Sequence, residues 1–406
     1  MRILHALAQR PGKTGSGVFL QELFAAGYKK GYTQAVLAGI PQTQIESNID
    51  NLDEKDFFPI YFESEDLPYP VVGMSDVMPY SSTKYSDIDE KMFTQYKSAF
   101  SLKIKEAVES FQPDVVISNH LWLMSSLIKE LYPNLKVLCL CHGTDLRQAE
   151  LSPNLFEIVK QNITKCDVAF ALNEVQKQTI IQKYGFKKDK VVVSGTGYDP
   201  SIFFQTPKPK TPPVKIVYVG KISNAKGVPH LLNAFESLGY NKDEVSLTLI
   251  GGGAGSESEN IQQKINSMKT SVKYLGFVEQ KELVENFYNS HIFILPSFFE
   301  GLPLVIIEAL ACGMRVISTQ LPGLKEFLGN IFEEIGAISY ITLPNMKSID
   351  KPKDKEVSSF EDAIAQALKK QIQAVLEHKE IDKQILTKNL EDKTWSGLFE
   401  RLEVYM

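Results

Sequence analysis

The sequence predicts an α/β protein of two domains, each built on a parallel sheet. Its 406 residues exceed what one ordinary core holds and suggest two domains of about 200 residues each. Short apolar strands alternate with helical patterns along most of the chain, which is typical of parallel sheets covered by helices on both faces. Four prolines between positions 206 and 213 interrupt this alternation and predict a linker there.

The composition excludes several classes of protein. Hydrophobic residues make up 43% of the chain and charged residues 23%, as in ordinary globular proteins. The net charge of −5 disfavours broad nucleic-acid binding, so an anionic ligand would need local cations. No apolar run approaches the ~20 residues that span a bilayer, and the chain opens on a predicted strand without a signal peptide. We therefore expect a cytoplasmic protein, and a peripheral membrane contact stays open.

The four cysteines, Cys139, Cys141, Cys166 and Cys312, lack the spacing of a metal site. Cys139 and Cys141 share one face of the predicted strand 136–141. We expect buried, reduced thiols, which agrees with a cytosolic location.

Seven buried strands are predicted in the first half of the chain. They are short and rich in apolar residues, and the helical patterns Phe93–Phe111 and Asn154–Lys165 lie between some of them. The predicted strands are 2–7, 34–38, 57–62, 114–118, 136–141, 167–171 and 191–194.

A glycine-rich turn follows the first strand. A P-loop would need a glycine where Leu7 stands, and a dinucleotide fingerprint would need one where Leu20 stands. What remains is a flexible turn that precedes a helical run from position 18, and a helix amino terminus suits phosphate or sugar oxygens. Gly15 and Gly17 are therefore candidate binding residues.

Asp87-Ile88-Asp89 matches a metal-holding pattern that should end an apolar strand. Here it lies in a polar segment at the start of a predicted helix, where acidic side chains suit the helix dipole. We interpret it as structural.

Polar side chains follow two strands of the first half. His142 comes directly after the strand 136–141, at the carboxyl end where parallel sheets bind ligands. Asn119 and His120 follow the strand 114–118 in the same way and are weaker candidates. A lone histidine is more often structural, so its position alone does not decide the matter.

Two lysines flank a strand-to-helix turn in the second half. The predicted strand Lys215–Val219 leads into Lys221, and Lys226 follows five residues later. Cations at this spacing could both reach one diphosphate, and two solvated surface lysines are the plain alternative. A second glycine loop, Gly251–Gly253, follows another apolar strand.

The stretch 296–313 is the most distinctive in the chain. It contains an apolar helix predicted at Leu304–Ala311, with Pro303 at its start and Gly313 just past its end. Predicted strands at 291–295 and 315–318 flank the stretch.

Two carboxylates stand out within it. Glu300 lies in the loop before the helix, and Glu308 lies inside the apolar helix, where burial without a partner would be costly. The pair predicts a ligand site, because ligands of such units bind at the carboxyl ends of the strands.

The sequence from Phe298 to Gly313 resembles the donor-sugar motif of GT-B retaining glycosyltransferases of family 4. His-Gly-Thr-Asp at 142–145, the lysine pair, the first glycine loop and the segment 394–402 resemble further motifs of that family, in the same order. The resemblance covers nearly the whole chain and is weakest over 41–110 and 340–390. It implies the GT-B fold, in which two Rossmann-like domains face each other across a cleft.

The resemblance also implies a domain plan. An acceptor-side domain would occupy 1–205, the proline-rich linker 206–213, and a domain that binds a nucleotide sugar 214–390. A final helix within 391–406 would cross back to the first domain.

The activity that the resemblance implies is a retaining, metal-independent transfer of a hexosyl-type sugar from a UDP- or GDP-sugar to an unidentified acceptor. His142 and Glu300 would be catalytic, Glu308 would hold the ribose hydroxyls, and Asn119 and His120 would face the acceptor. The donor-binding residues would be Gly15, Gly17, Lys221, Lys226, Val278, Gly301, Leu302, Pro303, Leu304, Val305 and Glu308. No metal and no other cofactor is expected.

Two alternatives stay open at this point. A sugar-nucleotide epimerase of similar fold would bind the same donor without an acceptor, and a catalytically silent subunit would keep the fold alone. The stretch Leu67–Tyr85 is either a surface loop or part of an acceptor pocket, and the charged segment 346–357 has no assigned role.

Overall fold

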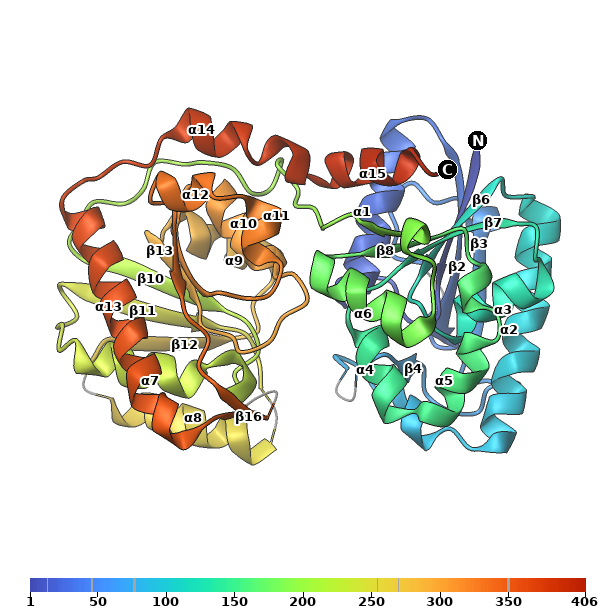
Figure 1. The fold of residues 1–406 in the computed structure, drawn as a ribbon, viewed down its shortest axis with the longest axis horizontal. Coiled ribbons are helices and arrows are strands. Elements are labelled where there is room, and N and C mark those ends of the chain that lie inside the picture. The colour runs from blue at the N-terminus through green and yellow to red at the C-terminus, as the bar shows by residue number, and fades with distance from the viewer. Residues whose placement is uncertain (13, 45–46, 76–77, 254, 269, 349–350) are drawn as a thin grey trace. The chain divides into compact units, whose positions relative to one another are not determined.

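The computed structural model describes residues 1–406 except 13, 45–46, 76–77, 254, 269 and 349–350. The described chain forms two compact units (Figure 1), one of Met1–Gly195 with Trp395–Met406 and one of Thr196–Thr394. Each unit is built on a parallel sheet, so the predicted α/β class is confirmed. The predicted linker, 206–213, lies within the second unit; the domain plan drawn from the sequence stays a prediction.

The sheet of the first unit has seven strands in the order β3-β2-β1-β6-β7-β8-β9. Strand β1 lies between β2 and β6, with Ile3 level with Gln34 and Val115. All seven strands were predicted, with ends that differ by three residues at most. They are β1 (Arg2–Leu7), β2 (Thr33–Pro41), β3 (Phe57–Phe62), β6 (Val115–Asn119), β7 (Lys136–Leu140), β8 (Val168–Ala171) and β9 (Val191–Val193).

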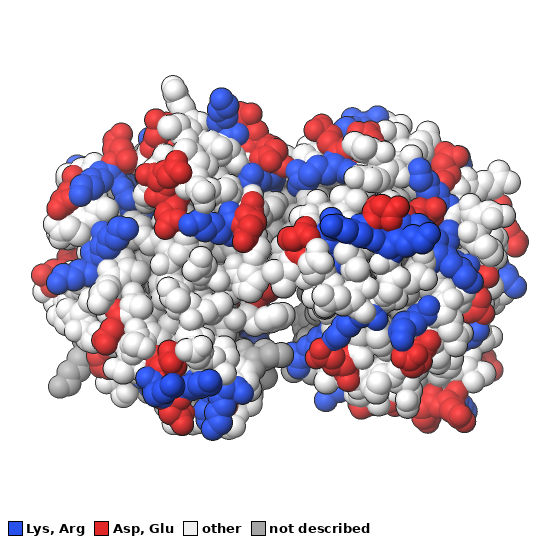
Figure 2. All heavy atoms as spheres, viewed as in Figure 1, with Lys and Arg blue, Asp and Glu red and all other residues white. Residues whose placement is uncertain are grey.

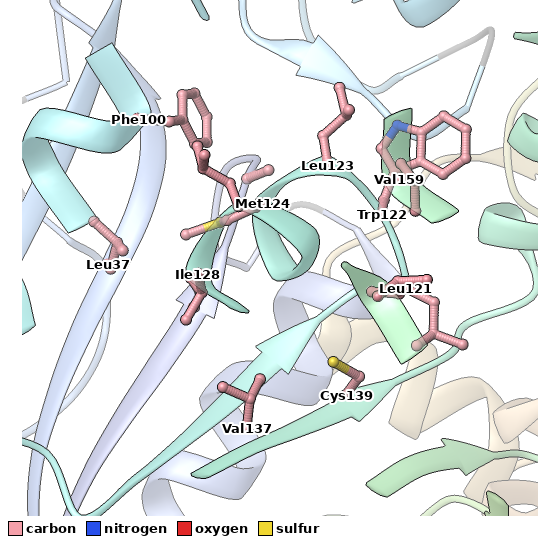
Figure 3. Close-up of a cluster of buried hydrophobic side chains, with 14 of the residues drawn as sticks. Leu37, Phe100, Leu121, Trp122, Leu123, Met124, Ile128, Val137, Cys139 and Val159 are labelled. Atoms are coloured by element: carbon pink, nitrogen blue, oxygen red, sulfur yellow. The ribbon is translucent and has the colours of Figure 1, made fainter. Parts of the chain in front are cut away.

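Helices cover this sheet and close its core. The apolar side chains labelled in Figure 3 come from β2, β7, the helices α2, α3 and α5, and the segment 121–122 that precedes α3. They form part of one buried cluster. The helices of this unit are α1 (Gly15–Lys29), α2 (Glu90–Phe111), α3 (Leu123–Leu131), α4 (Thr144–Leu151), α5 (Pro153–Lys160), α6 (Glu174–Tyr184) and α15 (Trp395–Glu403).

Asp89 caps the amino terminus of α2. Its carboxylate accepts a hydrogen bond from the backbone N–H of Met92 at 2.8 Å, which satisfies one of the free donors of the first turn. The cap agrees with the structural interpretation of Asp89.

The last helix, α15, packs against α1 in the first unit. The rings of Phe19 and Trp395 meet edge to face with centroids 5.1 Å apart. Lys30 Nζ lies 2.6 Å from a carboxylate oxygen of Glu403, and Arg401 Nε donates to the carbonyl of Ser194 at 2.8 Å. Apolar packing and peripheral polar contacts together hold the end of the chain to this unit.

The sheet of the second unit has six strands in the order β12-β11-β10-β13-β14-β15. They are β10 (Val214–Val219), β11 (Val245–Ile250), β12 (Val272–Gly276), β13 (Ile292–Leu295), β14 (Arg315–Thr319) and β15 (Ile338–Ile341). The helices are α7 (Val228–Ser237), α8 (Gly255–Ser267), α9 (Gln280–Tyr288), α10 (Leu304–Ala311), α11 (Leu324–Leu328), α12 (Ile331–Glu334), α13 (Val357–Leu376) and α14 (Lys383–Lys388).

Two small pairs of strands lie outside the main sheets. Parallel β4 (Val72–Gly73) and β5 (Thr83–Lys84) lie in the stretch 67–85, and antiparallel β16 (Met346–Ser348) and β17 (Lys351–Pro352) lie in the charged segment 346–357. Segments this short carry no usable hydrophobic period, and so the sequence did not predict them.

The distribution of surface charge and the state of the cysteines agree with what the composition predicts. Basic and acidic side chains are interspersed over the face in Figure 2. All four cysteines are buried and free, as predicted. Within the described ranges, no helix is both long and apolar enough to cross a bilayer.

Each sheet has one point at which the order of its strands reverses. In the first unit the chain builds outward on both sides of the β1–β6 pair, and in the second unit it does so on both sides of the β10–β13 pair. The loops that leave the carboxyl ends of such a pair diverge and leave a crevice, where ligands of open α/β sheets bind. The candidate residues therefore belong at these two points.

Candidate functional site

The switch point of the second unit is formed by the segments that follow β10 and β13. After β10 the chain passes Lys221 and a short 3-10 helix, Asn224–Lys226, before α7 begins. After β13 it passes Glu300 before α10 begins at Leu304. Because β10 and β13 are parallel neighbours, both segments leave the same edge of the sheet.

An ion pair joins the two segments. Lys226 Nζ lies 2.6 Å from Glu300 Oε2, and both side chains keep about a fifth of their surface exposed. Ser297 Oγ donates to the other carboxylate oxygen of Glu300 at 2.8 Å. Both carboxylate oxygens therefore have partners, and Glu300 is held in one orientation at the rim of the site.

The backbones of the two segments also touch. Gly227 has φ +69°, and a Cβ there would lie 2.1 Å from the carbonyl oxygen of Pro296. The N–H of Phe298 donates to the carbonyl of Ala225 at 3.0 Å. Only glycine allows both the left-handed backbone and this close approach.

The glycine loop after β11 adjoins the same edge. Gly251 has φ +128°, and a Cβ there would lie 2.0 Å from the carbonyl oxygen of Gly220. The N–H of Ile222 donates to the carbonyl of Gly252 at 2.8 Å. The loop after β10 thus contacts both the loop after β11 and the loop after β13, and the three loops lie side by side at this edge of the sheet.

Glu257 holds the loop after β10 in place, and the sequence analysis did not predict this role. Its carboxylate, in the first turn of α8, accepts from the N–H of Asn224 at 2.8 Å. The available signal was an acidic residue in the first helical turn after a glycine loop.

The other residues of the second unit predicted to bind the donor lie in α10 or in the segments that follow β10, β12 and β13. Lys221 has an exposed side chain, and its carbonyl accepts from the Tyr218 hydroxyl at 2.8 Å. Helix α10 spans the residues predicted, and its N-cap is Pro303, which offers no side-chain acceptor to the first N–H groups. Half-buried Glu308 lies one turn into α10, and half-buried Val278 follows β12.

The switch point of the first unit gathers Asn119, His120 and His142. His142 Nε2 lies 2.8 Å from the amide oxygen of Asn119, while the Asn119 amide nitrogen donates to the carbonyl of Ala6. An amide oxygen only accepts, so Nε2 of His142 carries a proton. The ring of His120 meets that of His142 with centroids 4.8 Å apart.

Burial keeps this pair of histidines neutral. It lowers the pKa of His120 to about 3. Burial, with the neighbouring His120, lowers the pKa of His142 to about 3 as well. Near neutral pH the cluster therefore offers hydrogen-bonding groups and no positive charge.

Asp145 fixes the loop that carries His142. Its buried carboxylate accepts from the backbone N–H groups of Leu121 at 3.0 Å, His142 at 2.6 Å and Gly143 at 3.1 Å. It therefore ties the segment after β6 to the segment after β7. The motif His-Gly-Thr-Asp at 142–145 contains this aspartate, but the motif alone does not indicate that its carboxylate binds the backbone.

The prediction that Gly15 and Gly17 lie in a loop is wrong. Both lie in the first turn of α1, whose N-cap Thr14 accepts from the N–H of Gly17 at 3.2 Å. A Cβ at Gly17 would lie 2.5 Å from the backbone nitrogen of Gly12, so this glycine serves close packing, whereas Gly15 faces open space.

Gln9 joins the glycine-rich segment to the stretch 67–85. Its amide nitrogen donates to the hydroxyls of Thr14 and Ser16, each at 2.9 Å, and its amide oxygen accepts from the N–H of Met74 at 3.1 Å. Part of that stretch therefore lies beside the switch point of the first unit.

Among the residues that the structure describes, no group of three or more His, Cys, Asp and Glu could hold a metal ion. Whether the reaction uses a metal is not decided by this, and metal independence stays a prediction.

Two family models match adjoining parts of the chain. The model described as Glycosyltransferase Family 4 matches residues 89–202, and the model described as Glycosyl transferases group 1 matches residues 199–342. Together they cover more than half of the chain. Every candidate residue except Gly15 and Gly17 lies within them.

Individual relatives are distant in sequence and similar in fold. A glycogen synthase of Mycobacterium tuberculosis (strain H37Rv) is 22% identical over 243 residues, which is 58% of each chain. A sucrose-phosphate synthase from Thermosynechococcus elongatus superposes over 100% of this chain and 98% of its own, with a TM-score of 0.70 and 16% identity. Anabaena Alr3699/HepE, solved in complex with UDP-glucose, does so over 100% and 98%, with a TM-score of 0.64 and 14% identity.

Two conclusions follow from these likenesses. The predicted GT-B fold is confirmed. The chain spans less than two thirds of the length of the glycogen synthase that it matches.

The neutral state of His5, His120 and His142 predicts how stability depends on pH. His5, His120 and His142 have folded-state pKa values of about 4, 3 and 3 because of burial, against about 6.5 in an unfolded chain. Their contribution is complete above pH 6.5 and is lost as the pH falls toward 3, because the unfolded state then binds more protons. We expect the free energy of unfolding, from urea titrations, to fall between pH 7.5 and pH 5.

The control is an NMR titration of the imidazole nitrogens over the same range. The signals of His120 and His142, assigned from single substitutions, should not titrate. A midpoint near 6.5 for either would contradict the burial argument.

Proposed function

This chain belongs to the glycosyl transferases group 1 family, and on that basis we propose that it is a retaining, metal-independent glycosyltransferase. The donor would be a UDP- or GDP-sugar that carries a hexosyl-type residue. The acceptor is unidentified. The Lys226–Glu300 ion pair at the switch point of the second unit is the observation that carries the proposal.

A nucleotide sugar presents two phosphates and several hydroxyl groups. The partly exposed Lys226 matches the phosphates, and Glu300 matches paired sugar hydroxyls, which a carboxylate accepts through two oxygens. With the donor bound, Lys226 would exchange part of its contact with Glu300 for a phosphate oxygen. Glu308, in α10, would accept from the ribose hydroxyls.

Charge stabilisation would provide most of the rate enhancement. When the anomeric C–O bond breaks, negative charge builds on the departing diphosphate. Lys221, Lys226 and the N–H groups that begin α10 would face that charge, and a helix amino terminus adds a favourable dipole. The donor-binding segment Gly301–Val305 supplies this turn.

The first unit would contribute neutral groups. His142, with its Nε2 proton directed to Asn119, is proposed to orient the sugar rather than to neutralise charge. That the anomeric configuration is retained is proposed from family membership. The residues suggest no nucleophile for a double displacement, and this fits a route in which the leaving phosphate acts as base.

The first test is turnover of a panel of UDP-, GDP- and ADP-sugars, measured as released nucleoside diphosphate with and without EDTA. We expect slow hydrolysis of one UDP- or GDP-sugar that persists in the chelator. Loss of activity with EDTA, restored by a divalent cation, would contradict metal independence. Failure to bind or cleave any donor would contradict the transferase and favour a silent subunit, and interconversion of two donors would favour the epimerase.

The second test separates the ion pair from general surface charge. We expect Glu300→Gln to lower kcat/KM roughly 10- to 100-fold, since hydrogen bonds to a charged group contribute about 1.5–3 kcal/mol. Lys226→Ala should lower kcat by about 10²–10³, as removal of one transition-state donor does. The matched controls are Glu285→Gln and Lys281→Ala, which change exposed residues of α9.

Both site variants should keep the unfolding midpoint of the parent chain within a few degrees. If Glu300→Gln turns over the donor at the parent rate, the assignment of Glu300 is wrong.

A further inference from the structure

A cavity lies in the second unit, away from the proposed donor site. It has a volume of about 560 Å³ and is lined by His291, directly before β13, and by Arg315, the first residue of β14. Both residues mark the amino ends of their strands, whereas the Lys226–Glu300 pair lies beyond the carboxyl ends. The cavity is therefore at the opposite edge of the second sheet.

The lining of this cavity is strongly basic. Two chain segments, 205–211 and 375–386, contribute most of it. Among the described residues that line it, Glu380 alone carries a carboxylate. The cations in the lining are Lys208, Lys210, Arg315, Lys379 and Lys383.

Most of these cations lack an anionic partner. Lys379 pairs with Glu377 at 2.7 Å. Arg315, only 7% exposed, donates to uncharged oxygens, among them Gly336 O at 2.9 Å and the Gln371 amide at 3.2 Å. Within the described residues, no carboxylate lies at ion-pair distance from any of the other four lining cations.

Two further groups in the lining lack a full set of partners: Lys208 has no anionic partner within the described residues, and Thr206 has an unsatisfied hydroxyl. Lys208 Nζ donates to the carbonyl of Phe287 at 2.9 Å, and burial lowers the pKa of this lysine to about 8. The hydroxyl oxygen of Thr206 is buried and has no hydrogen-bond partner in the described structure. Buried polar groups are normally satisfied, so an orphaned hydroxyl beside under-compensated cations points to a ligand.

We propose that this cavity binds a small organic molecule that carries a phosphate group. Phosphate oxygens accept hydrogen bonds from lysine and from a hydroxyl, and they match an excess of positive charge. The volume exceeds that of one phosphate, and Val375, Ile381 and Leu386 add apolar surface for the body of the molecule. The site is distinct from the donor site and does not depend on the proposed transferase activity.

The two segments that form most of the cavity lining lie near the ends of the second unit in the chain. The segment 205–211 follows the boundary between the units at Gly195 and Thr196, and the segment 375–386 precedes the boundary at Thr394 and Trp395. Both segments belong to the second unit, and a bound phosphate would touch both of them.

The test is isothermal titration calorimetry with inorganic pyrophosphate, on the whole chain. Pyrophosphate could also reach the proposed donor site, so the parent for this test carries Lys221→Ala and Lys226→Ala. We expect one saturable site on this parent, with an affinity that falls as salt rises. Adding Lys210→Glu with Lys383→Glu, both exposed, should weaken binding at least about tenfold through charge reversal.

The matched control adds Lys273→Glu with Lys370→Glu, two exposed lysines that do not line the cavity. Its affinity should stay within about twofold of the parent's, and Thr206→Val should weaken binding without charge reversal. Absence of binding to the parent would overturn the proposal. Equal weakening by the control pair would overturn it too, because binding would then follow net charge alone.

Discussion

The close approach of Gly227 to Pro296 is the constraint on which the candidate site depends. A side chain at position 227 would collide with the Pro296 carbonyl, so the segments after β10 and β13 can meet only because glycine stands there. Their meeting brings Lys226 within 2.6 Å of Glu300. At the switch point of the first unit, by contrast, burial lowers the pKa of His142 and keeps this side chain neutral.

The features that could be predicted from the sequence are those that depend on local patterns of residues. Helix α10 has the residues expected, Leu304–Ala311, because Pro303 and Gly313 mark its ends. The strands were found because buried parallel strands are short apolar runs. Glu300 was found because a carboxylate stands out in an apolar stretch, and the order of the strands then brings it to Lys226.

What the sequence did not predict depends on contacts between distant segments. The carboxylate of Asp145 binds the N–H of Leu121, 24 residues away, and no local pattern announces such a bond. The sequence predicts a loop at Gly15 because glycine usually marks one, whereas in the structure Thr14 caps a helix at that point. The basic cavity was missed because its cations come from three separate parts of the chain.

We propose that the second unit binds the nucleotide part of a sugar donor at the carboxyl ends of β10 and β13. Hydrogen–deuterium exchange with saturating UDP and, separately, GDP tests it most directly. We expect slower exchange at 220–227 and 296–305 with one of the two nucleotides. Unchanged exchange in both segments with either nucleotide, or protection confined to the first unit, would contradict it.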